Sequence, residues 1–291
     1  MRIDLHTHSN ASDGTETPAE VLAAAAAAGL DVVALTDHDT TGGWSPAAAA
    51  LPPGLTLVRG AEFSTVYRAR NGYPVSVHLL GYLFDPDDAG IVAEHLRLRA
   101  ERLGRGLAIV DRMVADGVPI SREQVLDFAA GAPVGRPHIG RALVAAGRVA
   151  SVDEAFQVYL AGNSKYYVAK ADTPVHTAIR LIADAGGVSV LAHGRSRSAA
   201  KVLSAEVFAE LVDVGLNGIE VDHPDHGATA RMELDGIARD LDLIRTGSSD
   251  YHGTNKAIRI GQETTDPDQL QRLVATSTGR VALIGPAGVA V

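Results

Sequence analysis

The sequence predicts an α/β fold built on a parallel sheet, either doubly wound or closed into a barrel. Short apolar stretches alternate with helical patterns over most of the chain, and strands separated by helices pair in parallel. Residues 31–35, for example, are almost wholly apolar, which is typical of a strand covered on both faces. Between residues 86 and 171 helical patterns dominate instead. We therefore expect residues 1–85 and 172–291 to form one α/β domain, with residues 86–171 inserted as a small helical lid or substrate domain.

A short strand at residues 2–8 opens the chain and leads into a polar loop. His6 and His8 are two residues apart, so they project from the same face of that strand. Together with Asp13 in the loop, they would suit a divalent metal ion held by nitrogen and oxygen ligands. A His-x-His pair taken alone is equally typical of ordinary surface or hydrogen-bonded histidines, so the interpretation depends on the residues at the ends of the later strands.

The second strand ends in the same way as the first. A helix begins at Thr17 and Pro18, a capping residue followed by proline at the first helical position, and it ends near Gly29. The strand at residues 31–35 then leads into a polar cluster that contains His38. Each of the first two strands is thus followed by a side chain able to bind a metal ion.

Two further strands carry Glu62 and His78. Residues 56–61 lead into Glu62, which we expect at the C-terminal end of its strand. His78 lies within the strand at residues 75–82 and therefore sits deeper than the other candidates.

The insertion is predicted from four helical stretches joined by turns that contain Gly and Pro, at residues 91–115, 121–129, 137–146 and 151–160. Ser121 and Ser151 are each followed three residues later by Gln or Glu, which resembles the start of a capping box. His95 lies inside the first stretch, and we expect it on the surface.

The alternation of helix and strand then returns, with helices at residues 173–185, 204–214 and 228–241 before strands at residues 187–193, 218–223 and 243–247. His193 ends the first of these strands. His223 and His226 follow the second, and Asp250 and His252 follow the third. Because the active site of a barrel lies at the C-terminal ends of its strands, we expect these side chains and the earlier candidates to meet there.

Six of the 11 histidines belong to this set, namely His6, His8, His38, His78, His193 and His252. Random placement would rarely bring so many histidines to such positions. The pattern therefore favours one metal centre over a series of unrelated histidines.

Composition limits the class of protein. With 46% hydrophobic residues the chain can form a globular core, and its net charge of −9 argues against a broad basic surface for duplex nucleic acid. The absence of cysteine excludes disulfides and any thiolate ligand or nucleophile. No apolar run approaches the ~20 residues of a membrane span, and a strand at the very start leaves no room for a signal peptide. We therefore expect a cytoplasmic protein with no membrane partner.

The motifs resemble those of the PHP (polymerase and histidinol phosphatase) superfamily in order and spacing over nearly the whole chain. They are His6-Thr7-His8, Thr36-Asp37-His38, Glu62, His78, Ala192-His193 and Ser249-Asp250-Tyr251-His252. The insertion, which contains Gly135-Arg136-Pro137-His138, narrows the resemblance to the stand-alone phosphoesterases of that superfamily. These act on nucleoside 3′,5′-bisphosphates, and some of them also trim short RNA from the 5′ end.

The resemblance implies a distorted (β/α)7 PHP barrel with a centre of two to three divalent ions, with manganese as the first expectation and iron or zinc as alternatives. Carried over position by position, it assigns His6, His8, Glu62 and Asp250 to one ion, Glu62, His78 and His193 to a second, and Asp13, His38 and His252 to a third. Every one of these positions holds a suitable residue. The resemblance therefore implies a complete centre.

Such a centre favours a phosphate substrate in spite of the acidic chain. Three divalent ions would bring six positive charges against the three negative charges of Asp13, Glu62 and Asp250, which leaves about three positive charges. The expected nucleophile is a metal-bridging hydroxide, because metal binding lowers the pKa of water to about 7. No covalent intermediate on the protein is needed.

Residues outside the ligand set are candidates for substrate contacts. Arg195 and Arg136 could clamp a phosphate through bidentate hydrogen bonds, and His138 lies with Arg136 at the start of a helix, where an anion is favoured. The alternatives are a solvated arginine at position 195 and a purely structural turn at position 136. Lys165 could likewise bind phosphate or stay in solvent.

Three more residues are expected near the chemistry. His223 or His226 could protonate the leaving group or contact phosphate, and we expect this of His226 first. Asp37 could orient a liganding histidine, the alternative being a simple turn aspartate. Catalysis is expected to depend on Asp13, His38, Glu62, Asp250, His226 and Arg195.

Together these features predict a metal-dependent phosphatase that removes the 3′-phosphate of nucleoside 3′,5′-bisphosphates and leaves the nucleoside 5′-monophosphate. Two other reactions stay open: 5′-to-3′ exonuclease action on short 5′-phosphorylated RNA, and hydrolysis of histidinol phosphate, to which the insertion is less suited. A non-catalytic nucleotide-binding module is an alternative from another class, and the complete ligand set argues against it. The expected partners are a small phosphorylated nucleotide or short RNA and no duplex DNA, and we expect a monomer or a small homo-oligomer.

Overall fold

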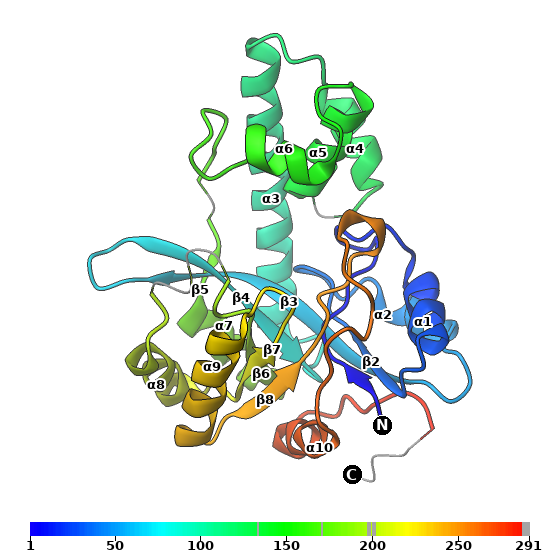
Figure 1. Cartoon of the computed structure of the whole chain (residues 1–291), viewed down its shortest axis with the longest axis vertical. Coiled ribbons are helices and arrows are strands. Elements are labelled where there is room, and N and C mark those ends of the chain that lie inside the picture. The colour runs from blue at the N-terminus through cyan, green and yellow to red at the C-terminus, as the bar shows by residue number, and fades with distance from the viewer. Residues whose placement is uncertain (133, 170, 197–198, 200–201, 287–291) are drawn as a thin grey trace.

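The structure, a computed structural model, describes residues 1–132, 134–169, 171–196, 199 and 202–286. Its centre is a nearly closed barrel of strands in the order β1-β2-β3-β4-β6-β7-β8, with the short β5 paired beside β3 (Figure 1). The strands are β1 (Ile3–Asp4), β2 (Val32–Leu35), β3 (Thr56–Arg68), β4 (Pro74–Tyr82), β5 (Thr173–Pro174), β6 (Val188–Ala192), β7 (Gly218–Asp222) and β8 (Ile244–Gly247). The predicted seven-stranded barrel is confirmed, and the doubly wound alternative is wrong.

One strand runs against its neighbours. β1, β2 and β3 are parallel, and so are β6, β7 and β8, but β4 pairs antiparallel with both β3 and β6. The expectation of a wholly parallel sheet is therefore wrong here. Only residues 69–73 separate β3 from β4, which is enough for a hairpin turn and too short for a helical crossover. The two strands project from the barrel as a ribbon (Figure 1).

An isolated bridge joins the first and last strands. Thr7, just after β1, forms a parallel bridge with Tyr251, which follows β8. The His8 amide donates to the Tyr251 carbonyl oxygen at 2.8 Å. We call this contact between residues 7–8 and Tyr251 the closing seam. It completes the barrel by pairing segments from nearly opposite ends of the chain.

Helices cover the outside of the barrel and form the insertion. They are α1 (Pro18–Ala27), α2 (Trp44–Ala49), α3 (Ala89–Ala115), α4 (Arg122–Ala129), α5 (Arg136–Ala145), α6 (Val152–Val158), α7 (Val175–Asp184), α8 (Ala205–Val214), α9 (Ala228–Asp240) and α10 (Pro267–Thr276), with a 3-10 turn at Gly253–Asn255. The sequence analysis did not predict α2 or α10. Within the described part of the chain, none of these helices is long and apolar enough to cross a membrane.

The helix starts largely follow the sequence signals. Thr17 caps α1 and Ser121 caps α4, each in a reciprocal capping box with the residue three positions on. At α6 the Ser151 hydroxyl accepts a hydrogen bond from the Glu154 amide, but the Glu154 carboxylate accepts from the Ala150 amide instead of returning to Ser151. Replacing a capping Thr or Ser by Ala typically costs about 1 kcal/mol.

The insertion stands on one end of the barrel, and α10 and the N-terminus lie at the other end (Figure 1). α3, 27 residues long, connects the two parts: Ile91 in its first turn packs in a core shared with β3, β4 and α7, whereas its last turns pack with α4, α5 and α6. The apolar core of the insertion includes Ile109, Val110, Met113, Val125, Ile139, Leu143 and Leu160. A division of the chain at residues 86 and 171 stays a prediction, because α3 contributes to both cores.

His95 of α3 is buried, contrary to its expected surface position. Its ring lies 4.8 Å from that of Phe63 in β3 and 6.3 Å from that of Phe84. The helical pattern alone does not show which face of α3 packs on the barrel, and this is why the prediction was wrong.

Candidate metal centre

The predicted metal ligands converge at the end of the barrel that faces the insertion. Most of them follow the C-terminal ends of strands, as expected, but Glu62 lies in the middle of β3. The expectation of a strand end is wrong because β3 continues into the projecting ribbon. Glu62 nevertheless lies at the same height in the barrel as the residues that follow β2. The pairing of β2 with β3 stops at Arg59, and beyond it His38 forms an isolated bridge with Glu62.

The first group of ligands surrounds one oxygen of Glu62. Glu62 Oε2 lies 3.2 Å from His6 Nε2 and 3.1 Å from His8 Nε2. Asp250 Oδ1 lies 3.5 Å from His6 Nε2 and 3.4 Å from His8 Nε2. Each of these four side chains is buried, and their nearest ligand atoms all fall within 4.8 Å of one another.

The second group uses the other oxygen of the same carboxylate. Glu62 Oε1 lies 2.7 Å from His78 Nδ1 and 3.0 Å from His193 Nε2. Glu62 therefore connects the first two groups, as the sequence analysis predicts for a shared ligand.

The third group forms around Asp13. Asp13 Oδ1 lies 3.3 Å from His252 Nε2, and Asp13 Oδ2 lies 3.8 Å from His38 Nε2. His8 contributes to this group as well, because its Nδ1 lies 4.0 Å from Asp13 Oδ1. The structure thus brings all nine predicted ligands together, with His8 between the first and third groups.

The arrangement fits metal ions better than it fits hydrogen bonds alone. The Nε2 atoms of His6 and His8 lie 3.0 Å apart, which directs two nitrogen lone pairs or two protons towards the same point. Among the described residues, His8 Nδ1, Asp13 Oδ1 and His38 Nδ1 are buried without a hydrogen-bond partner, a costly state for polar atoms unless a cation satisfies them. Imidazole and carboxylate ligands together suit manganese, iron or zinc.

The carboxylates of the centre are held in their ionised form. Burial works against the charge, but the surrounding imidazoles keep the pKa of Glu62 and Asp13 well below the usual range, and Lys256 with nearby histidines does the same for Asp250. Burial also opposes the charge on His8, yet Asp250 and Glu62 raise its pKa to about 9. At His38 burial prevails and lowers the pKa to about 3. The negative charge of the centre must therefore be balanced, either by protons on the histidines or by metal ions.

Backbone conformation at the strand ends is unusual. His193 has a φ of 32° and Asp250 a φ of 55°, in the left-handed region that non-glycine residues rarely adopt. Residues held in this region typically cost about 1–3 kcal/mol and concentrate at functional sites. The chain therefore bears local strain at two of its metal ligands.

Glu220 supports the centre, and the sequence analysis missed it. This fully buried carboxylate accepts a hydrogen bond from the His193 amide at 2.6 Å and lies 3.1 Å from His6 Nδ1. It also accepts from the Ser248 hydroxyl. Burial raises its pKa, but His223 and His6 outweigh burial and lower it to about 2. A carboxylate inside an otherwise apolar strand is itself a signal, because such residues are rarely buried without a partner.

Asp37 was expected from the sequence to orient a liganding histidine, but its carboxylate makes other contacts. Its carboxylate accepts from the Ser9 amide at 2.8 Å, the Ser9 hydroxyl at 2.7 Å and the Ser12 hydroxyl at 2.7 Å. It therefore shapes the loop that carries Asp13. Asp4 acts in the same way on the loop before Asp250, where it accepts from the Ser249 hydroxyl at 2.6 Å.

The insertion reaches the centre through Arg102 and His138. Arg102, in the middle of α3, donates to Asp39 Oδ2 at 2.5 Å next to His38, and it was not predicted. His138 is buried, and its Nδ1 accepts from the Gly135 amide at 2.9 Å. Burial lowers the pKa of His138, although Asp13 and the Ser12 backbone oppose this shift. His138 thus lies close to the metal-binding loop.

The two histidines after β7 differ in what their nitrogens contact. His226 Nδ1 donates to the Val221 carbonyl oxygen at 2.9 Å, and its Nε2 accepts from the Arg195 amide at 3.2 Å. His223 Nδ1 accepts from the Asp225 amide at 3.0 Å, and its Nε2 is 3.5 Å from Asp250 Oδ2. The geometry therefore favours His223 over His226 for contact with a substrate, the reverse of the sequence-based preference.

The predicted arginine and lysine clamps lie at different distances from the centre. The Arg195 guanidinium donates to the Leu203 carbonyl oxygen at 2.6 Å and to Glu233 at 3.3 Å, although its backbone lies beside the ligand His193. Lys165 pairs with Asp116, roughly 20 Å along α3 from Arg102 at the rise per residue of an α-helix. The structure does not bring the Lys165 side chain to the metal centre. Substrate contacts by Arg195 and Lys165 stay predictions.

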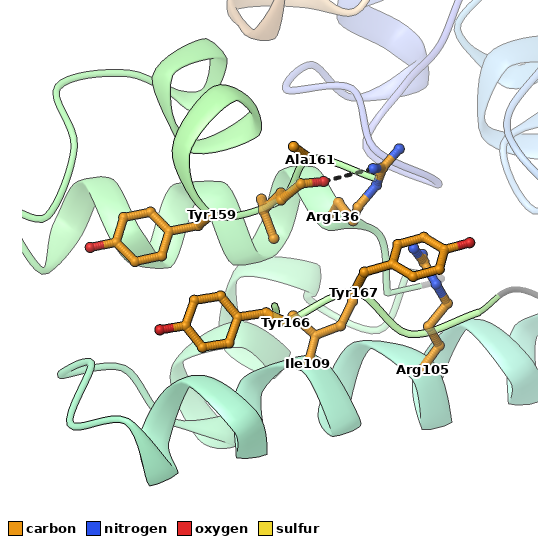
Figure 2. Close-up of a pocket in the computed structure, with 8 residues that line it drawn as sticks. Arg105, Ile109, Arg136, Tyr159, Ala161, Tyr166 and Tyr167 are labelled. Carbon is orange, nitrogen blue, oxygen red and sulfur yellow. Dashed lines mark hydrogen bonds between the residues drawn. The ribbon is translucent and has the colours of Figure 1, made fainter. Parts of the chain in front are cut away.

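Arg136 lines a pocket inside the insertion (Figure 2). Its guanidinium donates to the Leu160 carbonyl oxygen at 2.8 Å and lies over the ring of Phe156 at 4.9 Å. The space is small, about 10 Å³, opens to solvent, and is lined by Arg105, Ile109, Arg136, Tyr159, Leu160, Ala161, Tyr166 and Tyr167. Arg105 lies three residues beyond Arg102, so the pocket begins about 4.5 Å further along α3 than the contact with Asp39.

A barrel of this topology, with nine converging imidazole and carboxylate ligands, defines a metal-dependent hydrolase. A family model described as the PHP domain matches residues 4–98. The chain is 31% identical to a 5′-3′ exoribonuclease of Haemophilus influenzae, over 90% of this chain and 93% of that protein. It is 30% identical to a 3′,5′-nucleoside bisphosphate phosphatase of Chromobacterium violaceum, over 91% of this chain and 92% of that protein.

A solved structure supports the same conclusion. A protein from Bifidobacterium adolescentis, described as a metal-dependent phosphoesterase, superposes with a TM-score of 0.89 at 36% identity and covers 96% of this chain and 97% of its own. The chain therefore belongs to the PHP family, and it is a metal-dependent phosphoester hydrolase. The alternative of a non-catalytic binding module is wrong.

Proposed function

We propose that this enzyme hydrolyses the 3′-phosphate of nucleoside 3′,5′-bisphosphates and releases the nucleoside 5′-monophosphate and phosphate. One observation carries the proposal. A small pocket lined by Arg105 and Arg136 lies about one helical turn of α3 away from the contact between Arg102 and Asp39, the residue after His38. A substrate with two phosphates can place one at the metal centre and the other beside these guanidinium groups.

The aromatic lining of the pocket supports a nucleoside. Tyr159 and Tyr166 stack with ring centroids 6.1 Å apart, and Arg105 lies 5.9 Å from the ring of Tyr167. Exposed tyrosine rings bind bases by stacking with little dependence on base identity. Tyr167 is 43% exposed and so is available for such a contact.

In the proposed reaction the three ligand groups would hold two to three divalent ions, manganese first among them. When bound, such ions would act as Lewis acids on the phosphate ester and would lower the pKa of water to about 7. His223 donates a hydrogen bond from Nε2 to the leaving oxygen, which takes its proton from water. Because its Nδ1 accepts from the Asp225 amide, the neutral ring carries its proton on Nε2, the atom directed at Asp250.

The test is phosphate release by the manganese-loaded enzyme from adenosine 3′,5′-bisphosphate, beside AMP and histidinol phosphate. We expect a preference for the bisphosphate, with AMP as the nucleotide product. The Arg105→Met variant should raise KM for the bisphosphate about tenfold, the value of a charge-assisted hydrogen bond, while the exposed Arg239→Met variant should leave it unchanged. Equal turnover of the three substrates, or none, would contradict the proposal.

A second candidate is 5′-to-3′ exonuclease action on short 5′-phosphorylated RNA. The same pocket could bind the 5′-phosphate and place the next phosphodiester over the metal centre, and a relative of this chain is an exoribonuclease. A ladder assay with 5′-phosphorylated oligoribonucleotides separates the two. The absence of any shortened product would remove this candidate.

A further inference from the structure

Lys256 places a positive charge at the edge of the metal centre. Its ammonium pairs with Asp250 Oδ2, and its charge also acts on Asp13 and Glu62, which belong to the other ligand groups. The side chain is 36% exposed, so the ammonium reaches the ligands while part of the side chain stays in contact with solvent. Neither the sequence motifs nor the proposed mechanism assigns it a role.

The turn that carries Lys256 is fixed to the metal-binding loop. The Thr254 amide donates to Thr15 Oγ1 at 2.9 Å, and the Asn255 side chain donates to the Asp13 carbonyl oxygen at 2.7 Å. Gly253 adopts a φ of +65°, and a Cβ there would lie only 2.1 Å from Thr15 Oγ1. The backbone thus holds the start of the Lys256 side chain at a set position beside Asp13.

The two oxygens of Asp250 face different surroundings. Oδ1 lies 3.5 Å from His6 Nε2, 3.4 Å from His8 Nε2 and 3.3 Å from His252 Nδ1, which are all predicted ligands. Oδ2 faces His223 Nε2 at 3.5 Å and the Lys256 ammonium. One oxygen is therefore directed into the ligand cluster, and the other towards a cation and an N–H donor.

We propose that Lys256 binds the phosphoryl group that is hydrolysed, through its ammonium and on the same side of the centre as His223. A lysine suits this position because its ammonium is a compact charge on a flexible stem, which can turn from Asp250 to a phosphate oxygen without moving the backbone. The ammonium then neutralises charge on the phosphoryl oxygens, and His223 Nε2 stays directed at the leaving oxygen. The inference rests on the phosphoester hydrolase activity and not on the preference for bisphosphates.

The experiment measures the affinity of the manganese-loaded protein for inorganic phosphate by calorimetry, together with the bound metal per chain. The variants are Lys256→Met and Lys256→Gln, with Lys256→Arg as the conservative change and Arg239→Met as a charge-matched control on an exposed helix face. We expect unchanged metal content, phosphate affinity about 10- to 100-fold lower in the Met and Gln variants, partial recovery with Arg, and no change in the control.

Phosphate affinity within twofold of the wild type in a Met or Gln variant that retains its metal would overturn the inference. Loss of metal in both variants would overturn the inference as well. The lysine would then act by neutralising the charge of Asp250 and not by binding phosphate. No bisphosphate is used in this measurement, so its outcome is independent of the proposed nucleotide substrate. Turnover of p-nitrophenyl phosphate by the same variants should show the loss mainly in KM.

Discussion

Glu220 holds two ligands of the metal centre in place at once. It lies beside His6 Nδ1, which directs His6 Nε2 towards Glu62, and it also fixes the backbone at His193. Carboxylates that orient liganding histidines in this way commonly change metal affinity by about 10- to 100-fold when they are replaced.

The Glu220→Gln variant should therefore bind manganese about 10- to 100-fold more weakly, because the amide keeps the shape of the side chain but loses its charge. A chelator-competition titration measures this, with Glu123→Gln on the exposed face of α4 as the control. Equal affinities of the variant and the wild type would show that Glu220 serves only to hold the strands together.

The residues that converge at the candidate metal centre could be predicted from the sequence, whereas their supporting residues could not. The ligands stand in motifs such as His6-Thr7-His8 and at strand ends, where the chemistry of each residue is recognisable without the fold. The contacts of Glu220 with His6 and of Lys256 with Asp250 become visible only in the fold, where Thr7 after β1 bridges to Tyr251 after β8. For Asp37 the sequence predicted a contact that the fold does not form. Its position beside His38 suggested a contact with a histidine, but its carboxylate accepts hydrogen bonds from Ser9 and Ser12.

α3 is the element that connects the insertion to the centre. In its first half, His95 packs against Phe63 of β3. In its middle, Arg102 donates a hydrogen bond to Asp39. His95 Nε2 is buried and has no hydrogen-bond partner in the part of the chain that the structure describes. Burial lowers the pKa of His95, although Asp39 and Glu94 oppose the shift.

This burial predicts a pH dependence of stability. Below about pH 6.5 the unfolded chain takes up a proton at His95 that the folded protein resists, so the free energy of unfolding falls as the pH decreases. The contribution of one proton is at most about 1.4 kcal/mol per pH unit. The His95→Leu variant should lose less stability than the wild type between pH 6.5 and 5.5.

Denaturant unfolding at pH 7.5, 6.5 and 5.5 measures the difference. The slope of the free energy against pH is the quantity to compare, because the substitution also changes packing by an amount that does not depend on pH. Parallel curves for the two proteins would contradict the prediction.

At the level of elements, the βα units after residue 172 were predicted most faithfully. Their alternating apolar and helical patterns are local, and so they can be recognised from neighbouring residues. The antiparallel β4 escaped prediction because strand direction depends on the partner strand and not on the strand's own residues. α10 was overlooked although Asp266 and Pro267 are ordinary helix-start signals.

For the whole molecule, the closing seam and the metal centre occupy the same place. Thr7 and Tyr251 bridge β1 to the segment after β8, and each lies between two predicted ligands. Metal ions bound between His8 and Asp250 would therefore also hold the barrel closed. At a free metal concentration 100 times Kd, the added stability is about 2.7 kcal/mol.

Metal should accordingly slow hydrogen exchange at the His8 amide and in residues 248–252, and a chelator should reverse the effect. The insertion serves as an internal control, because its separate apolar core does not include the seam. Peptide-level exchange measured by mass spectrometry tests this. Equal protection of the seam with and without metal would show that the barrel closes independently of the ions.

The closing seam can form only after the segment that follows β8 has been synthesised. The segment that carries His6, His8 and Asp13 leaves the ribosome first, while Asp250 and His252 emerge only when most of the remaining chain has been made. Contacts so distant in sequence form slowly, and a nascent chain must keep its charged first segment in solution until its counterpart arrives. Translation stopped before Asp250 would yield a chain that can neither close its barrel nor assemble two of its three ligand groups.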